Sequence, residues 1–195
     1  MGVGEQRVRV IAGQWRGRRI EAPAGVGTRP TSDRVREAVF SAIQSRIGDW
    51  EGVRALDLYA GSGALGIEAL SRGASHVVFV DSDRGAAACI RRNLRSLDVG
   101  SDLATVLTAR VGDTVVQRLP RSPVSLLFAD PPYRIDAAAV TRVFRTLAEA
   151  GLVQRGALVV YEHAAGASPP WPEGFAAEEP RRYGDTAVSL ARYDA

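Results

Sequence analysis

From residue 54 onward, short apolar runs alternate with longer amphipathic runs, and this pattern constrains the fold of the chain more than any other. The strand-like runs are 55–59, 76–81, 104–109, 124–129 and 157–162. The helix-like runs between them are 65–72, 83–97 and 136–150, with a weaker fourth helix at 113–119. Strands that alternate with helices pair in parallel through right-handed crossovers. We therefore expect a parallel sheet with helices on both faces.

The two ends of the chain depart from this alternation. Residues 175–183 and 186–193 read as an antiparallel pair that closes the sheet edge. Residues 7–20 read as a β-hairpin with its turn near Gly13, and residues 23–30 as a Pro- and Gly-containing linker. A helix follows, capped by Thr31 or Ser32, whose apolar stripe is formed by Val35, Val39, Phe40, Ile43 and Ile47. We predict an arm with its linker, residues 1–30, and a main domain, residues 31–195.

Positive charge is concentrated in this arm. The net charge is only +3, but residues 1–36 hold eight arginines against three acids, which leaves −2 for the rest of the chain. Such a cluster predicts contact with nucleic-acid phosphates. The alternative is a solvated surface in a protein that uses arginine throughout, because the chain has no lysine. The arginines concerned are Arg7, Arg9, Arg16, Arg18, Arg19, Arg29, Arg34 and Arg36.

Other classes of protein are disfavoured by composition. Cys89 is the only cysteine, so an internal disulfide is impossible, and with only His76 and His163 we expect no metal site. No apolar run approaches the roughly 18 residues that span a bilayer, and the N-terminus lacks a signal-peptide core. We expect a cytoplasmic protein without a membrane span.

A glycine-rich turn follows the first strand of the main domain. Gly61, Gly63 and Gly66 fit the pattern G-x-G-x-x-G between a strand and a helix. In that pattern the first glycine permits a tight turn, the second permits close approach of a ligand, and the third permits helix–strand packing. Asp81 ends the next strand twenty residues after Gly61 and can accept both ribose hydroxyls of an adenosine-containing cofactor.

Asp57 bears on the identity of that cofactor. It lies within the first strand, just before the glycine turn. A carboxylate there would repel the pyrophosphate of a dinucleotide, but it could pair with an ammonium group. Asp57 therefore favours S-adenosylmethionine over a dinucleotide, which stays open as the alternative.

The second chemical motif is Asp130-Pro131-Pro132-Tyr133, which follows an apolar strand. The two prolines fix the backbone and carry no N–H, so the loop presents acceptors beside an aromatic ring. Acceptors of this kind can orient the exocyclic amino group of a planar base and take up charge as a C–N bond forms. Tyr133 can stack on the base, a contact worth roughly 1–3 kcal/mol. The alternative is that the prolines simply end the strand.

The carboxylate of Asp130 also bears on which base is bound. Guanine presents adjacent donors at N1–H and N2–H₂, which an acceptor-only carboxylate can bridge. Adenine and cytosine present a donor beside an acceptor, which suits the amide of asparagine better. Asp130 therefore favours guanine.

Five segments together resemble a known family. They are residues 9–20 (RVIAGQWRGRRI), 29–38 (RPTSDRVREA), 56–74 (LDLYAGSGALGIEALSRGA), 130–133 (DPPY) and 182–186 (RYGDT). The sequence resembles the bacterial RsmD family of 16S ribosomal RNA guanine-N2 methyltransferases over nearly its whole length. The resemblance implies a class I S-adenosylmethionine-dependent methyltransferase fold, Rossmann-like, with a mostly parallel seven-stranded sheet, helices on both faces and an N-terminal β-hairpin extension.

The resemblance also implies roles for the matching residues. Asp81 and Ser82 would hold the ribose of S-adenosylmethionine, and Asp113 would lie near its adenine amino group. Asp130 to Tyr133 would receive the guanine, and residues 7–36 would bind 16S rRNA within the 30S subunit. We expect a monomeric enzyme. The residues implied for the methionine end of the cofactor are Asp57, Tyr59, Ala60, Gly61, Ser62 and Gly63.

Three other functions stay open at this point. The first is methylation of another amino group, in DNA adenine or cytosine or in a protein glutamine, although those enzymes more often carry Asn before Pro-Pro-Tyr. The second is a non-catalytic ribosome-assembly factor that binds rRNA. The third is a nicotinamide-dependent oxidoreductase, which would leave the Asp130 motif without a role.

Overall fold

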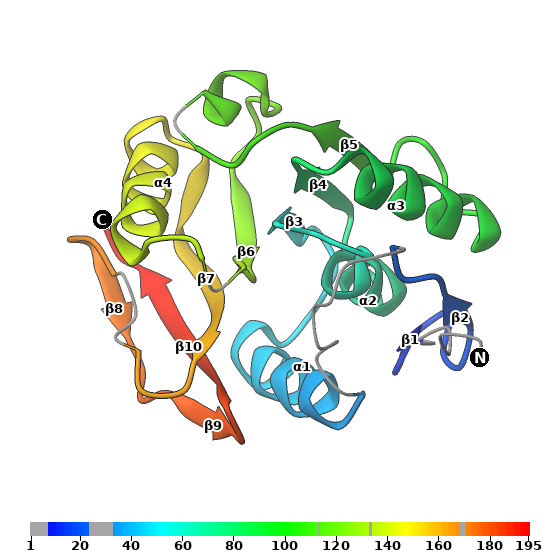
Figure 1. Ribbon diagram of the computed structural model, residues 1–195, viewed down its shortest axis with the longest axis horizontal. Coiled ribbons are helices and arrows are strands. Elements are labelled where there is room, and N and C mark those ends of the chain that lie inside the picture. Colours follow the sequence, from blue (N-terminus) through cyan, green and yellow to red (C-terminus); the bar gives the residue numbers. More distant parts are fainter. Residues whose placement is uncertain (1–7, 24–32, 113, 133, 168–170) are drawn as a thin grey trace.

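The computed structural model describes residues 8–23, 33–112, 114–132, 134–167 and 171–195. They form one main sheet with helices on both faces and a small hairpin beside it (Figure 1). Five strands pair in parallel in the order β5-β4-β3-β6-β7. Their bounds are β3 Arg54–Leu58, β4 His76–Asp81, β5 Ala104–Thr108, β6 Val124–Ala129 and β7 Val153–Ala164. The predicted parallel α/β sheet is confirmed.

The edge beyond β7 is antiparallel, as predicted. Strand β10, Thr186–Tyr193, runs against β7. On its other side it pairs with β8, Phe175–Ala177, and with β9, Arg181–Tyr183. Both short strands lie along the same side of β10. Pro180 lies between them, and because proline has no N–H for the ladder, the pairing with β10 is interrupted there. The eight strands of the sheet therefore fill seven positions across it.

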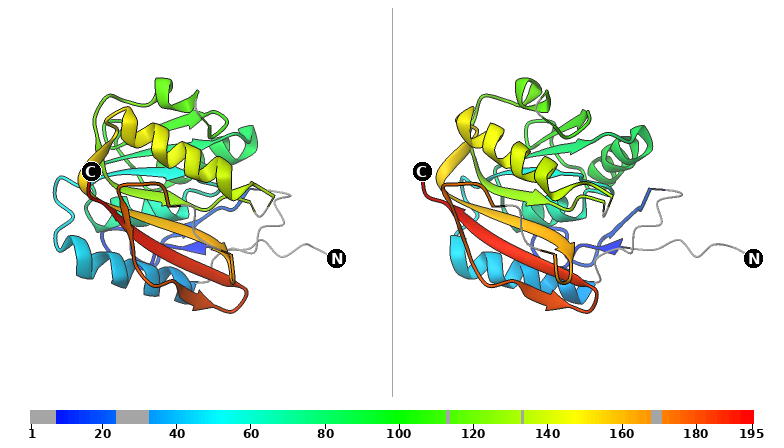
Figure 2. Two further views of the ribbon diagram at one scale, coloured as in Figure 1. Left: turned by 90° about the vertical axis from the view of Figure 1, so that its left-hand side faces the viewer. Right: turned by 60° about the vertical axis from the view of Figure 1, so that its left-hand side comes forward.

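Helices cover the two faces of the sheet (Figure 2). Helices α1, Asp33–Ile47, α2, Ala64–Arg72, and α3, Arg84–Ser96, pack on one face. Helix α4, Ala137–Glu149, and a short 3₁₀ helix, η1, Val115–Arg118, pack on the other. The predicted fourth helix is thus a single 3₁₀ turn, and residue 113 lies outside the described residues, as do Thr31 and Ser32. Among the described helices, none is both long and apolar enough to cross a bilayer.

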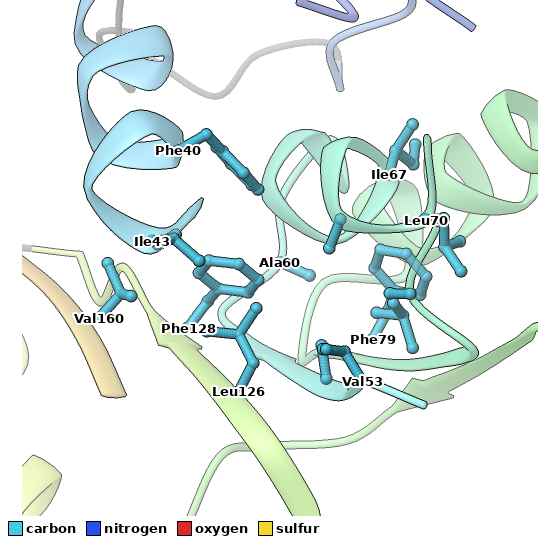
Figure 3. Close-up of a cluster of buried hydrophobic side chains, with 14 of the residues drawn as sticks. Phe40, Ile43, Val53, Ala60, Ile67, Leu70, Phe79, Leu126, Phe128 and Val160 are labelled. Atoms are coloured by element: carbon cyan, nitrogen blue, oxygen red, sulfur yellow. The ribbon is translucent and has the colours of Figure 1, made fainter. Parts of the chain in front are cut away.

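The core on the α1–α2–α3 face fixes α1 against the sheet (Figure 3). Phe40 and Ile43 of α1 point toward Phe128 of β6, and all three are fully buried. The rings of Phe40 and Phe128 lie 5.7 Å apart between centroids. Burial of a side chain of this size contributes about 1.5–3 kcal/mol. Helix α1 is therefore held firmly although it precedes the alternating part of the chain.

The predicted N-terminal hairpin is present and packs against the same core. Strand β1, Val8–Arg9, pairs antiparallel with β2, Arg19–Ile20. Val8, Val10, Trp15 and Ile20 are buried and join the hydrophobic cluster of α1, α2 and α3. The division into an arm, residues 1–30, and a main domain stays a prediction, and residues 1–7 and 24–30 lie outside the described residues.

Candidate active site

The strand order reverses between β3 and β6. From β3 the chain moves outward to β4 and β5, and it then returns to the other side of β3 as β6. At such a reversal the connecting loops diverge and leave a crevice beyond the carboxyl ends of the strands. The register places Leu58 opposite both Val80 and Ala129, and Ala129 opposite Tyr161. The carboxyl ends of β3, β4 and β6 therefore meet at one edge, beside Tyr161 of β7.

A tight turn joins β3 to α2 at this edge. Gly61 and Gly63 have positive φ angles of 56° and 80°, and the N–H of Gly63 donates to the carbonyl oxygen of Ala60 at 2.7 Å. Tyr59 also lies in the left-handed region, with φ 59°, which is costly for a residue with a side chain. Burial raises the pKa of Tyr59 to about 12. Strain of this kind concentrates at functional sites.

Gly66 has the packing role expected from its motif. A Cβ atom at this position would lie 2.3 Å from Cε1 of Phe79, so only glycine allows α2 to approach β4 this closely. Gly63 has a packing role as well. A Cβ there would meet Ile90, Ile67 and Phe79 at 3.2–3.3 Å, so it would point into the core rather than toward a ligand. Gly63 is required for its positive φ and for packing.

Asp57 is buried directly beneath the glycine turn. Its Oδ2 accepts the N–H of Gly66 at 3.0 Å, which ties β3 to the first turn of α2. Burial raises the pKa of Asp57 from 3.8 to about 8; the Gly66 hydrogen bond opposes this shift, and the charge of Asp81 adds to it. A nearby cation would stabilise the ionised form of this carboxyl.

Asp81 holds the turn from the neighbouring strand. Its Oδ2 accepts the N–H of Gly61 at 2.8 Å, and its Oδ1 accepts the N–H of Asp83 at 2.8 Å. Each carboxylate oxygen can accept a second hydrogen bond, so ribose hydroxyls can still be bound. Ser82 beside it is exposed, and Asp83 caps α3 by accepting the N–H of Ala86 at 2.7 Å.

Asp130 follows β6 at the same edge and is an exposed residue. Its pKa is raised well above the usual value by loss of surrounding water and by the charges of Glu162 and Asp57. Pro131 is buried and Pro132 half-buried, and the carbonyl oxygen of Pro132 accepts the N–H of Ile135 at 2.8 Å. The stiffness of this loop stays a prediction. Tyr133 and Asp113 lie outside the described residues.

Two members of this site were missed in the sequence. Glu162 ends the apolar run of β7, as Asp81 ends that of β4, and this repeated position was the available signal. Asn93 is buried in α3, and its Nδ2 donates to the carbonyl oxygens of Ser62 and Glu21 at 3.0 Å each. Asn93 thereby joins the glycine turn to the segment that leaves the hairpin. A single asparagine in a helix gives no sequence signal for such a role.

The hairpin is anchored to α2 through two polar residues. Glu68 is buried and accepts the N–H groups of Ile11 and Ala12 at 2.7 and 3.0 Å, and it pairs with Arg72 at 2.8 Å. Ser71 Oγ accepts the N–H of Trp15 at 3.0 Å. The same helix that begins at the glycine turn therefore carries the hairpin on its outer side (Figure 1).

The arginines predicted to bind RNA fall into three groups. Arg16, Arg18, Arg19 and Arg34 are exposed, and the exposed Arg9 pairs with Asp33 at 3.0 Å. Arg36 is 2% exposed, and its guanidinium bonds to Asp33 and to the carbonyl oxygen of Arg9. Arg36 was wrongly grouped with the RNA-binding residues, because its buried guanidinium joins α1 to the hairpin. Arg7 and Arg29 lie outside the described residues.

Comparison with known proteins assigns the family. The sequence model of the family described as "Conserved hypothetical protein 95" matches residues 8–192. The chain belongs to this family. Its resemblance to the RsmD family is confirmed by relatives that carry that family's name.

Two of these RsmD-family relatives are named "Ribosomal RNA small subunit methyltransferase D". The one from Escherichia coli strain K12 is 40% identical over 131 residues, which are 67% of this chain and 63% of that protein. This chain therefore aligns with less than two thirds of that relative. The Haemophilus influenzae relative is 36% identical over 155 residues, which are 80% of this chain and 78% of that protein.

A solved structure supports the fold. The Escherichia coli protein yhhF, a proposed methyltransferase, aligns with a TM-score of 0.80 at 30% identity, over 97% of this chain and 99% of that one. The RsmD-family chain thus has the Rossmann-like class I methyltransferase fold that was predicted, with its hairpin extension.

Proposed function

We propose that the protein transfers a methyl group from S-adenosylmethionine to the N2 amino group of one guanine in 16S rRNA of the 30S subunit. The observation that carries this proposal is the acidic edge at the strand reversal. There Asp57 and Asp81 flank the glycine turn, and Asp130 faces it from β6. The rRNA methyltransferase names of the Escherichia coli and Haemophilus influenzae relatives support the same reaction class.

The chemistry of the edge fits this cofactor. Three carboxyl groups, Asp57, Asp130 and Glu162, interact electrostatically at one edge of the sheet. This arrangement favours a cationic ligand and opposes a pyrophosphate. When bound, S-adenosylmethionine supplies an electrophilic methyl group on a sulfonium centre.

The residues that would hold the cofactor follow from their positions. Asp57 would balance the amino group of its methionine end beneath the turn of Tyr59, Ala60 and Ser62. Asp81, with Ser82, would accept the ribose hydroxyls while its N–H contacts keep Gly61 in place. Asp113 would lie near the adenine amino group. The turn is already fixed by protein hydrogen bonds, so little ordering would be required on binding.

Asp130 would act on the guanine. Its carboxylate would accept hydrogen bonds from N1–H and N2–H₂ and thereby orient the N2 lone pair toward the methyl group. S-adenosylmethionine would supply the methyl group to N2 and keep the sulfur as a neutral thioether, and Asp130 would take the proton that N2 loses.

The rest of the loop would position the base. Pro131 and Pro132 restrict the backbone beside Asp130, and Tyr133 would stack on the guanine ring. Holding the two reacting atoms in line contributes a large part of the rate in such reactions. The exposed arginines of the hairpin, Arg16, Arg18 and Arg19, would bind phosphates of the same RNA.

The test is methyl transfer from radiolabelled S-adenosylmethionine to three substrates. These are 30S subunits from cells that lack the modification, protein-free 16S rRNA, and double-stranded DNA. We expect label in rRNA, most strongly in the 30S subunits, and none in DNA. Transfer to DNA alone would contradict the RNA substrate. Absence of transfer to every substrate, together with tight RNA binding, would instead indicate a non-catalytic assembly factor.

A further inference from the structure

The outer face of α3 carries a stripe of arginines that the site described above does not include. Arg84, Arg91 and Arg95 are exposed and are spaced by seven and four residues. At 100° per residue these positions lie within about 40° of one another around the helix axis, and they span about 16 Å along it. Helix α3 contains no acidic residue. The three guanidinium groups therefore form one line of positive charge, here called the α3 stripe.

Two acids, Asp83 and Asp98, flank the α3 stripe in the sequence, but neither forms an ion pair with it in the described residues. Within the described ranges, none of its three arginines forms an ion pair, whereas the neighbouring Arg92 pairs with Glu21 at 2.8 Å. Arg91 donates to the carbonyl oxygen of Val106 at 3.0 Å, which uses one of its five N–H donors and fixes its direction. Arg91 and Arg95 also line a surface hollow of about 250 Å³ between α3 and the edge strand β5.

The α3 stripe connects the candidate active site with the hairpin. Arg84 lies three residues after Asp81, at the edge where the cofactor would bind. At the other end, Arg18 of the hairpin donates from Nη2 to the carbonyl oxygen of Ser96 at 2.5 Å. The hairpin and α3 lie on the same side of the molecule, with α2 beside them (Figure 1). The α3 stripe thus begins beside the site and ends one residue before Ser96, which Arg18 contacts, while Arg91 is directed toward β5.

We propose that Arg84, Arg91 and Arg95 bind consecutive phosphates of the rRNA whose guanine reaches Asp130. This inference rests on the proposed function and adds a second RNA-binding surface to the hairpin. A span of about 16 Å accommodates about three phosphates of one RNA strand. The arginines of α4 provide a contrast, because Glu149 follows Arg145 by four residues on that helix, whereas α3 contains no acidic residue.

The experiment compares two double variants that remove equal charge. Arg91→Gln with Arg95→Gln interrupts the α3 stripe, while Arg142→Gln with Arg145→Gln is the matched control on exposed positions of α4. Arg84 is left in place because it adjoins the cofactor site. Binding to unmodified 30S subunits is measured between 50 and 200 mM salt. We expect about tenfold weaker binding for the α3 variant, with a salt slope reduced by about 0.7–0.9 per lost contact, and a change below twofold for the control.

A third variant separates charge from structure. Arg91→Lys with Arg95→Lys keeps both charges and is expected to retain most of the affinity. Equal binding by the α3 glutamine variant and the control would overturn the proposal, and so would an equal loss in the lysine and glutamine variants. Wild-type methyl transfer is measured in parallel. If the wild type methylates rRNA but the α3 variant binds like the control, only the stripe is refuted; if the wild type methylates no RNA, the proposed function fails first.

Discussion

Gly66 donates its backbone N–H to Oδ2 of Asp57 at 3.0 Å, and this bond joins the strand before the glycine turn to the helix after it. The acceptor is a carboxyl group that is 2% exposed. Because burial disfavours the charged form, the pKa of Asp57 is raised to about 8. A residue placed for the cofactor therefore also affects stability, and its effect depends on pH.

The Asp57→Asn variant tests this pH dependence. The unfolded chain releases the Asp57 proton near pH 3.8, whereas the folded protein keeps it until about pH 8. Between these values the folded state binds more protons, so the stability of the wild type falls as pH rises, by up to about 1.4 kcal/mol per pH unit. Asparagine does not titrate. Urea unfolding at pH 5, 6, 7 and 8 should show the wild type losing stability relative to Asp57→Asn, and a constant difference would contradict this prediction.

Gly66→Ala should destabilise the fold by about 1–3 kcal/mol. The new Cβ would lie 2.3 Å from the ring of Phe79, and the close-packed face between α2 and β4 would have to shift. Gly112→Ala is the control, because a Cβ there meets no atom within 4 Å. Thermal unfolding of both variants provides the measurement. An equally small change in both midpoints would mean that the α2–β4 contact is less tight than described.

Glu68→Gln should loosen the hairpin from α2. The Ile11 and Ala12 N–H groups bond to different oxygens of the Glu68 carboxylate, and glutamine replaces one of these oxygens by an NH₂ donor, so one N–H group loses its acceptor. The negative charge that pairs with Arg72 is lost as well. Breaking a buried ion pair in this way costs about 3–5 kcal/mol. Limited trypsin digestion should then cut the arginine-rich hairpin sooner than in the wild type. Glu149→Gln, at an exposed position of α4, should leave the digestion rate unchanged.

The hairpin arginines should contribute to RNA affinity through charge. Arg16→Gln with Arg19→Gln removes two exposed guanidinium groups, while Arg18 stays because it bonds to Ser96. The affinity for 16S rRNA should fall, and by a similar factor for RNA fragments of different sequence. The dependence of this affinity on salt concentration should become less steep. Filter binding at several salt concentrations measures both effects. Unchanged affinity would indicate instead that these arginines form a solvated surface that does not contact RNA.

Local sequence patterns predicted the elements but not the long-range contacts. The strands β4 and β6 have the predicted bounds because their apolar runs end at polar residues, Asp81 and Asp130. The burial of Arg36 could not be predicted, because a charge count does not show which guanidinium another element covers. The link from Asn93 to Ser62 depends on how α3 packs against the turn, which no local spacing encodes.

Glycine positions show the same division between local and long-range information. The packing role of Gly66 follows from its place in the motif, and the structure confirms it. The motif also suggests ligand approach at Gly63, whereas its missing side chain faces Ile90, Ile67 and Phe79. Two of these neighbours, Ile90 and Phe79, belong to α3 and β4, which lie further along the chain. A motif therefore indicates where a glycine is needed more reliably than why.

The central claim, that Asp130 presents a guanine amino group to the methyl donor, is tested most directly by analysing the modified nucleoside. Unmodified 30S subunits are incubated with the protein and S-adenosylmethionine carrying a deuterated methyl group, and the rRNA is digested for mass spectrometry. The wild type should yield labelled N2-methylguanosine. Asp130→Asn should lower its yield by about 10²–10³-fold while cofactor affinity stays within threefold. Label in adenosine or cytidine, or full activity of Asp130→Asn, would contradict the assignment.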